Sequence, residues 1–224
     1  MNTLNLGFNG SFLSQDRLGQ ARWATTLTTG HVRLQDRLQS LNPRLDTQGN
    51  FTKLVGNYRM SRPLATEGEG GKWNMNVRGS GQMHVSGANL DNAEKFQLGG
   101  PDGVRGYPVG EGWGDAGYLA SLEFGRALPV ERIHGASFFM FVDTRSVTRN
   151  PNAAQAAEAS DGMPNTYNLH SAGLGLKLDF TPTTLMQLVV AGPLGKNPVQ
   201  VNGLNTDGRG VSQSRVWLTL NGRF

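Results

Sequence analysis

The 224-residue sequence contains no cysteine and no long run of apolar residues. The absence of cysteine excludes a disulfide framework and a thiolate metal site. A membrane-spanning helix needs about 18 or more consecutive apolar residues, and no segment of this sequence meets that requirement. Neither absence excludes a transmembrane β-barrel, because alternate residues of every barrel strand face a polar lumen.

Charge is also sparse, since only 17% of the residues are charged and the net charge is +4. The basic residues are scattered along the chain, so they do not form the basic stripe of a nucleic-acid-binding protein. The first ten residues lack the basic segment and the apolar segment of a secretory signal peptide. We therefore expect no nucleic-acid partner, and no signal peptide within this sequence.

Motifs for enzyme chemistry are missing as well. Gly79-Ser80-Gly81 falls short of a G-x-S-x-G nucleophile elbow, and Gly71-Lys72 lacks the earlier glycine of a P-loop. The histidines have no metal-ligand spacing: His84 is expected to face the lumen, and His134 and His170 are expected at strand ends. We expect no catalytic residue, cofactor or metal, and a protein that is not an enzyme. A hydrolase with a Ser/His pair on a barrel wall stays open as an alternative.

What the sequence does contain is a repeated alternation of apolar and polar residues, the period of a β-strand with one apolar face. Strands of roughly 9 to 12 residues are long enough to cross a bilayer at a tilt, whereas strands of globular proteins are usually about 5 or 6 residues long. The alternation predicts nine antiparallel strands, over residues 4–12, 22–34, 51–61, 73–85, 117–128, 134–143, 169–180, 184–191 and 214–224.

The connections between these predicted strands alternate in length. They are short near residues 129–133 and 181–183 but long over 96–116, 144–168 and 192–213. Outer-membrane barrels show this pattern, with short periplasmic turns and long outer loops, and bacterial single-chain barrels have even strand numbers. Strands in lipid must close into a barrel because unpaired backbone groups there cost several kcal/mol each. An odd number of strands therefore indicates either a missed strand or a part of a larger barrel.

A glycine-rich segment, residues 96–118, precedes the fifth predicted strand. Glycine permits positive φ and close packing, but a flexible spacer would combine it with serine rather than with arginine and aromatic residues. We interpret the segment as a long loop that folds back and places Arg105 inside the barrel. Asp143, which ends a predicted strand on its lumen side, is a candidate partner because an isolated carboxylate in a lumen favours a bidentate arginine. The residues alone leave open a solvated turn and two separate solvated charges.

Several motifs resemble the transporters of two-partner secretion, which are the haemolysin-activator and filamentous-haemagglutinin exporters. The motifs are LGGPDGVRGY (98–107), GDAGY (114–118) and the strand that carries Glu123. FVDTR (141–145) resembles the F-x-D-x-G motif of the same family, although Arg145 replaces the final glycine and puts the local turn in doubt. The terminal Phe224 resembles the C-terminal aromatic residue of proteins that the barrel-assembly machinery inserts.

The resemblance implies that the VRGY loop lies in the barrel lumen and that Arg105 pairs with Asp143, in the motif that begins at Phe141. It also implies functional importance for Gly100, Val104, Gly106, Tyr107, Gly114, Asp115 and Glu123. A full family member would have about sixteen strands, preceded by a plug helix and POTRA domains. Residues 1–224 would then be the C-terminal portion of the barrel, a truncated form without POTRA domains or signal peptide.

We therefore expect an all-β fold, an antiparallel transmembrane β-barrel in the bacterial outer membrane. The expected function is translocation, with secretion or activation, of a large exoprotein such as a haemolysin or adhesin. Expected partners are that exoprotein, outer-membrane lipid and the barrel-assembly machinery, which would recognise Phe224. The alternative is a small, self-contained porin or adhesion barrel of eight or ten strands.

Overall fold

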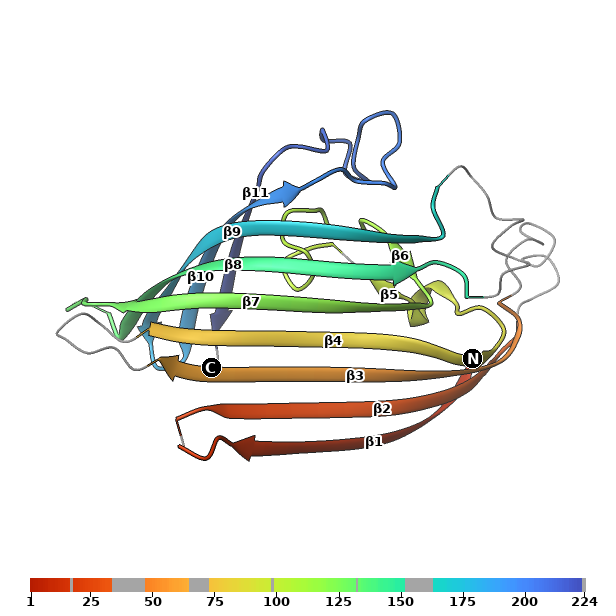
Figure 1. Cartoon of the computed structure of the whole chain (residues 1–224), viewed down its shortest axis with the longest axis horizontal. Coiled ribbons are helices and arrows are strands. Elements are labelled where there is room, and N and C mark those ends of the chain that lie inside the picture. Colours follow the sequence, from red (N-terminus) through yellow and green to blue (C-terminus); the bar gives the residue numbers. More distant parts are fainter. Residues whose placement is uncertain are drawn as a thin grey trace.

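The alternating residues build a single antiparallel sheet of nine long strands (Figure 1). The computed structural model describes residues 1–16, 18–33, 47–64, 73–97, 99–131, 133–151 and 163–222. Each strand of the sheet pairs with the next one in the order β1-β2-β3-β4-β7-β8-β9-β10-β11, so the predicted fold class is confirmed. The strands are β1 (Asn2–Leu13), β2 (Gln20–Val32), β3 (Gly49–Leu64), β4 (Trp73–Gly87), β7 (Ala116–Leu128), β8 (Gly135–Thr148), β9 (Thr166–Thr181), β10 (Thr184–Leu194) and β11 (Arg215–Gly222).

The two faces of the sheet differ in chemistry because the alternation is kept in register from strand to strand. Leu122 lies opposite Val142, which in turn lies opposite Ala172, so apolar residues share the outer face. The exposed apolar residues of this face include Leu4, Leu6, Phe8, Tyr118, Leu122, Val142, Leu174, Val190, Val216, Leu218 and Leu220. Such a continuous apolar surface is what a barrel strand presents to lipid.

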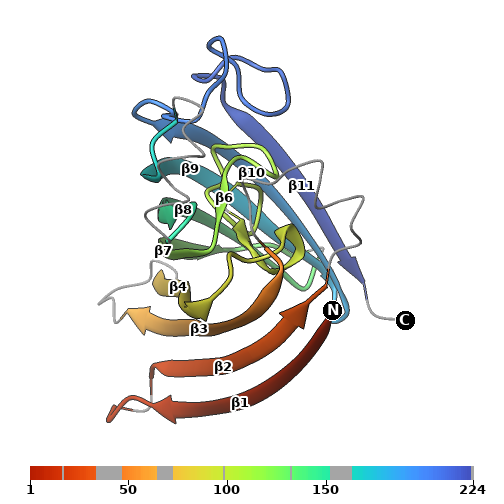
Figure 2. The same ribbon diagram turned by 90° about the vertical axis from the view of Figure 1, so that its right-hand side faces the viewer.

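The sheet is strongly curved but does not close. The curvature is plain in Figure 2, where β1 and β11 lie at opposite ends of the arc. No described residue pairs with the outer edge of either strand. Turns at one end of the sheet are short, after β1 (14–19), β7 (129–134) and β9 (182–183), whereas the connections after β4 (88–115) and β10 (195–214) are long.

The connection between β4 and β7, residues 88–115, folds back into the hollow of the sheet (Figures 1 and 2). We call it the inward loop. It contains a short 3-10 helix, η1 (Asn92–Glu94), and a two-stranded ribbon of β5 (Phe96–Gln97) and β6 (Trp113–Gly114). Within the described part of the chain, no helix has the length and hydropathy needed to cross a membrane.

Two details of the predicted strands are corrected. Asp143 does not end a strand, because the alternation continues through Arg145 and Val147 and β8 runs on to Thr148. His170 is not at a strand end either: β9 begins at Thr166, and the exposed His170 ring contacts the Thr144 hydroxyl at 2.8 Å on the outer face. His134 lies immediately before β8, in the turn from β7.

Candidate functional site

The inward loop is held by side chains that are almost completely removed from solvent. Val104, Arg105, Tyr107, Glu111 and Asp115 are each at most 2% exposed. Three of these residues are ionisable, one basic and two acidic. Burying an ionised group is costly unless it is paired and hydrogen-bonded. The candidate site is therefore defined by the partners that these loop residues find on the inner face of the sheet.

Arg105 and Asp143 form a bidentate ion pair in the centre of the inner face. The Arg105 Nε donates to Asp143 Oδ2 at 2.9 Å, and Nη2 donates to Oδ1 at 2.7 Å. The backbone N–H of Arg105 also donates to Oδ2, at 3.1 Å, and the Ser171 hydroxyl donates to the same oxygen at 3.3 Å. The pair, which we call the Arg105–Asp143 lock, therefore fixes both the side chain and the backbone of the loop to β8.

The remaining surface of the Arg105 guanidinium is also occupied. Nη1 donates to Glu123 Oε1 at 2.5 Å, and Nη2 donates to the Ser121 hydroxyl at 3.0 Å. The guanidinium carbon lies 3.4 Å from the centre of the Phe141 ring, a cation–π arrangement. On the far side, the Trp217 indole N–H donates to the Arg105 carbonyl at 2.7 Å. The structure thus brings Arg105 together with Asp143, Phe141 and Glu123, all of them residues singled out in the sequence.

These contacts keep Arg105 charged. Burial by itself would lower the pKa of Arg105, but the hydrogen bonds and negative charges of Asp143 and Glu123 outweigh it and raise the pKa above its ordinary value. Planar guanidinium and carboxylate groups with two parallel hydrogen bonds also have a fixed mutual orientation. The lock therefore holds the loop in one orientation, and both of its parallel hydrogen bonds have to break together before the loop can move.

Gly106 allows the loop to approach the sheet closely enough for the lock to form. A Cβ at this position would lie 2.7 Å from Ser171 Cβ and 2.8 Å from the Gly192 carbonyl carbon, distances that real Cβ atoms do not show. Gly100 serves another purpose: with φ of +102° it makes a turn that L residues rarely adopt. Its N–H donates to the Tyr107 carbonyl at 3.1 Å and so closes the VRGY segment into a compact unit.

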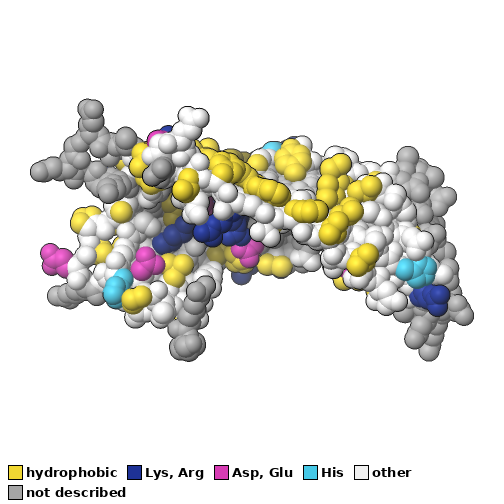
Figure 3. Space-filling view, turned by 90° about the horizontal axis from the view of Figure 1, so that it is seen from below, with side chains coloured by type: hydrophobic (Ala, Val, Ile, Leu, Met, Phe, Trp, Pro, Cys, Tyr) yellow, Lys and Arg dark blue, Asp and Glu magenta, His cyan; other side chains and the backbone are white. Residues whose placement is uncertain are grey.

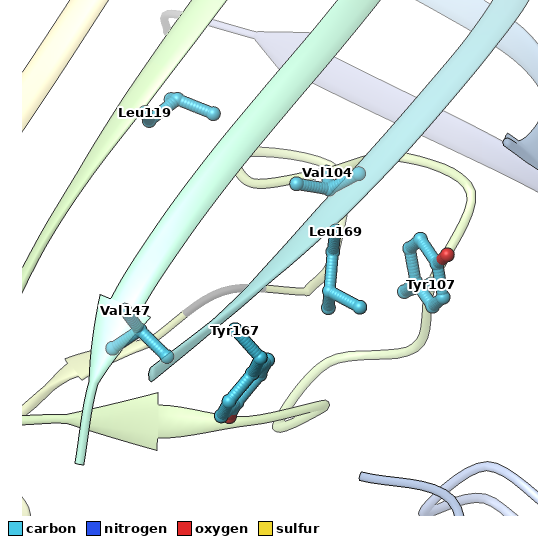
Figure 4. Packing of buried hydrophobic residues seen from close by; sticks show 6 residues of the cluster. All are labelled: Val104, Tyr107, Leu119, Val147, Tyr167 and Leu169. Atoms are coloured by element: carbon cyan, nitrogen blue, oxygen red, sulfur yellow. The ribbon is translucent and has the colours of Figure 1, made fainter. Parts of the chain in front are cut away.

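Two apolar loop residues pack next to the lock. Val104 and Tyr107 are fully buried, and Figure 4 shows them lying against side chains of the sheet. The cluster consists of Val104, Tyr107, Leu119, Val147, Tyr167 and Leu169. Burial, together with the nearby charge of Glu111, raises the pKa of Tyr107 to about 12. Because the neutral phenol is the favoured form, the contribution of Tyr107 to stability is complete below its ordinary pKa near 10 and is lost as pH rises toward 12.

Asp115 and Gly114 anchor the end of the loop. The Asp115 carboxylate pairs with Lys95 Nζ at 3.0 Å and accepts the Leu90 N–H at 2.9 Å, so it fastens the start of the loop to its end. Gly114 runs against β8: a Cβ there would lie 2.3 Å from the Thr148 carbonyl oxygen. Both residues named in the sequence therefore have structural partners here, separate from those of the lock.

Glu111 is a buried residue of the inward loop that the sequence does not single out. Its carboxylate accepts the Thr206 N–H and hydroxyl, both at 2.8 Å, and is also bonded by the Asn197 amide. Thr206 and Asn197 belong to the connection between β10 and β11, so Glu111 ties the inward loop to that connection. The nearby Asp207 has its pKa lowered chiefly by hydrogen bonds from Arg215. The available signal was one of three acids in a glycine-rich segment, which does not identify partners more than eighty residues away.

The other predicted residues fall outside this site. Phe224 lies outside the described residues. His84 lies on β4, and its ring contacts the Ala88 carbonyl at 2.9 Å. In the described segments no group of three or more His, Cys, Asp or Glu side chains is placed to hold a metal ion.

An open, curved sheet with an apolar outer face and a loop locked inside it defines the class of an outer-membrane-type β-barrel. The family profile "Haemolysin secretion/activation protein ShlB/FhaC/HecB" matches residues 3–178, and the chain belongs to this family of two-partner secretion transporters.

Curated relatives and a solved structure also resemble this chain. The "Heme/hemopexin transporter protein HuxB" of Haemophilus influenzae strain 86-028NP is 27% identical over 198 residues, and that of strain ATCC 51907 is 27% identical over 202 residues. Both alignments cover 88% of this chain and 33% of the relative, so the chain spans about a third of their length. CdiB from Acinetobacter baumannii shares the fold, with a TM-score of 0.54 at 14% identity over 98% of this chain and 42% of that chain.

Proposed function

We propose that this chain forms part of an outer-membrane conduit that exports a large polypeptide by two-partner secretion. The observation that carries the proposal is the Arg105–Asp143 lock, which holds a glycine-rich loop inside the hollow of a sheet with an apolar outer face. An occluding loop fastened by one directional pair is a suitable device for a channel that must be sealed at rest and opened for cargo.

The mechanism follows from where the contacts lie. At rest the inward loop fills the hollow beside β7, β8 and β9 and is fixed at Asp143. A passing polypeptide would need the space that the loop occupies, so the loop has to shift during export. Glu123 and Ser121 lie on the neighbouring β7 and already accept hydrogen bonds from the same guanidinium. They therefore remain as acceptors when Arg105 separates from Asp143.

The cargo is proposed to be a secreted exoprotein, either a haemolysin, which the family description names, or an adhesin. The HuxB relatives are described as haem/hemopexin transporters, which makes a haem-related exoprotein a further candidate. Outer-membrane lipid would cover the apolar face, and the barrel-assembly machinery would recognise the C-terminal segment that ends at Phe224.

We also propose that the nine strands are the C-terminal portion of a larger closed barrel. Both β1 and β11 present an edge that pairs with no other described strand. Unpaired backbone groups in lipid cost several kcal/mol each, so an isolated open sheet would be unstable in a membrane. Further strands that join these two edges would remove that cost.

Export by the complete transporter tests the proposal. We expect Arg105→Ala to abolish release of the exoprotein into the medium while the barrel still inserts, because the lock is lost but the outer face is unchanged. Arg126→Ala is the matched control, since Arg126 lies beside Trp73 on the outer face, 5.8 Å from the ring centre. Normal export by Arg105→Ala, with the variant present in the outer membrane, would contradict the proposed role.

A further inference from the structure

The first half of the sheet carries a row of three arginines that the lock does not use. Arg22 on β2 lies directly opposite Arg59 on β3, and Arg59 lies directly opposite Arg78 on β4. All three are on the inner face, and we call them the arginine ladder. Like charges placed directly opposite each other on neighbouring strands are destabilising. Three consecutive strands therefore keep an arrangement that works against the stability of the sheet.

The ladder also lacks the acidic partners that other basic residues in the hollow of the sheet have. Those partners form the pairs Lys53–Glu94, Lys95–Asp115, Arg105–Asp143 and Arg215–Asp207. Across the residues that the structure describes, the side chains of Arg22, Arg59 and Arg78 take part in no ion pair and no hydrogen bond, although the charges of Asp143, Glu123 and Asp102 act on Arg78 from a distance. The Nη2 atom of Arg78 is even buried without a hydrogen-bond partner. The positive charge of the ladder thus has no directly bound acid among the described residues.

The ladder lies at the same level as the lock. The register continues from Arg78 to Ser121 on β7 and from Ser121 to Asp143 on β8. The three arginines line a cavity of about 520 Å³ together with Arg105 and Lys177, against only two acids, Asp102 and Glu123. Glu123 is already bound to Arg105. Figure 3 shows basic side chains gathered left of the centre of the view from below, with acidic atoms next to them.

We propose that the arginine ladder binds carboxylate groups of an extended, acidic stretch of the exported polypeptide. Neighbouring strands are about 4.8 Å apart, so the ladder spans about 10 Å, and an extended chain repeats one face every 7 Å or so. The row runs across the strands, so a passing segment meets the three guanidinium groups side by side, and its successive acidic side chains come within their reach in turn; each guanidinium can bind a carboxylate bidentately. The inference rests on the proposed export function and adds the class of cargo: polypeptides with clustered Asp and Glu.

Single-channel recording of the complete transporter in a planar lipid bilayer tests this inference. The probes are an oligoglutamate and an oligolysine of equal length, and the measured quantity is how long each peptide blocks the current. We expect oligoglutamate to block at least about tenfold longer than oligolysine, which corresponds to a tenfold slower dissociation and, at equal entry rates, to a tenfold higher affinity. We expect Arg59→Gln to remove most of that difference, and Arg126→Gln, which removes one charge from the outer face, to preserve it.

Two outcomes would overturn the inference. One is equal blocking by the two peptides, and the other is an oligoglutamate block that Arg59→Gln leaves unchanged. The proposed export function is tested separately, by measuring exoprotein release from the Arg105→Ala variant, because Arg105 does not belong to the ladder. If Arg105→Ala stops export while both peptides block the current equally, the proposed role of the lock is supported and the proposed role of the ladder is contradicted.

Discussion

The two halves of the sheet have the same outer face but opposite inner faces. From β7 to β11 the inner face is covered by the inward loop, and its charged residues, such as Asp143 and Arg215, are buried and paired. At the level of the lock, β2 to β4 instead carry the exposed or half-buried arginine ladder with no acidic partner among the described residues. The bilayer requires the outer alternation in both halves, whereas the inner face can differ between them. Lys53 on β3 and Gln82 on β4 also bond the inward loop, but at the level of the lock only the second half fastens it, and the arginine ladder is left open for a ligand.

The largest expected difference between the halves concerns two aspartates. Asp143→Ala leaves the Arg105 guanidinium buried without its main partner, and breaking a buried pair in this way costs about 3–5 kcal/mol. Asp16, in the turn after β1, also pairs with an arginine, Arg62, at 2.5 Å, but both side chains are exposed. Exposed pairs contribute little, so Asp16→Ala should leave stability unchanged within error. Urea unfolding of the complete, reconstituted barrel, followed by tryptophan fluorescence, measures both.

Similar losses for the two aspartate variants would contradict the comparison. A small loss for Asp143→Ala would mean that Glu123 takes over the whole charge of Arg105. The double variant Asp143→Ala/Glu123→Ala distinguishes this case, because the coupling between neighbouring partners of one arginine appears as non-additivity.

The sequence shows the strands and the apolar face clearly because both depend on a local two-residue period. The position of the inward loop was harder to predict. Glycine content indicated a fold-back, the residues alone offered Asp143 only as one candidate partner of Arg105, and the family resemblance favoured that pairing. The partners that complete the site were not predictable. Trp217 is 112 residues from Arg105, and Thr206 is 95 residues from Glu111. Such contacts depend on the curvature and register of the whole sheet, which no short segment encodes.

The next comparison concerns two glycines, one from each region. Gly106→Ala places a methyl group against Ser171 and the backbone of Gly192, so we expect the loop to be displaced at a cost of about 1–3 kcal/mol. Gly56, on β3, has an ordinary φ, and a methyl group added there would meet no heavy atom within 4 Å. Gly56→Ala should be neutral or stabilising by up to about 1 kcal/mol. The same unfolding assay, together with the export assay, separates the two variants.

Equal tolerance of the two alanines would mean that the VRGY segment is held more loosely than its contacts indicate. In that case the lock distances of 2.7 and 2.9 Å would not be maintained in the membrane. Normal export by Gly106→Ala, with unchanged stability, is the result that would establish this.

The smallest effect is expected in the ladder, and its sign is the informative part. Arg59→Gln relieves repulsion from both Arg22 and Arg78, so we expect the free energy of unfolding to rise by about 0.2–1 kcal/mol. Arg126→Gln removes a cation near the Trp73 ring and should have no effect or lower stability by up to about 1 kcal/mol. The gain from Arg59→Gln should shrink at high salt, since the Debye length falls from about 10 Å at 0.1 M to about 3 Å at 1 M. A loss of stability in Arg59→Gln would instead mean that Arg59 supports the sheet, and the retention of the ladder would then need no ligand to explain it.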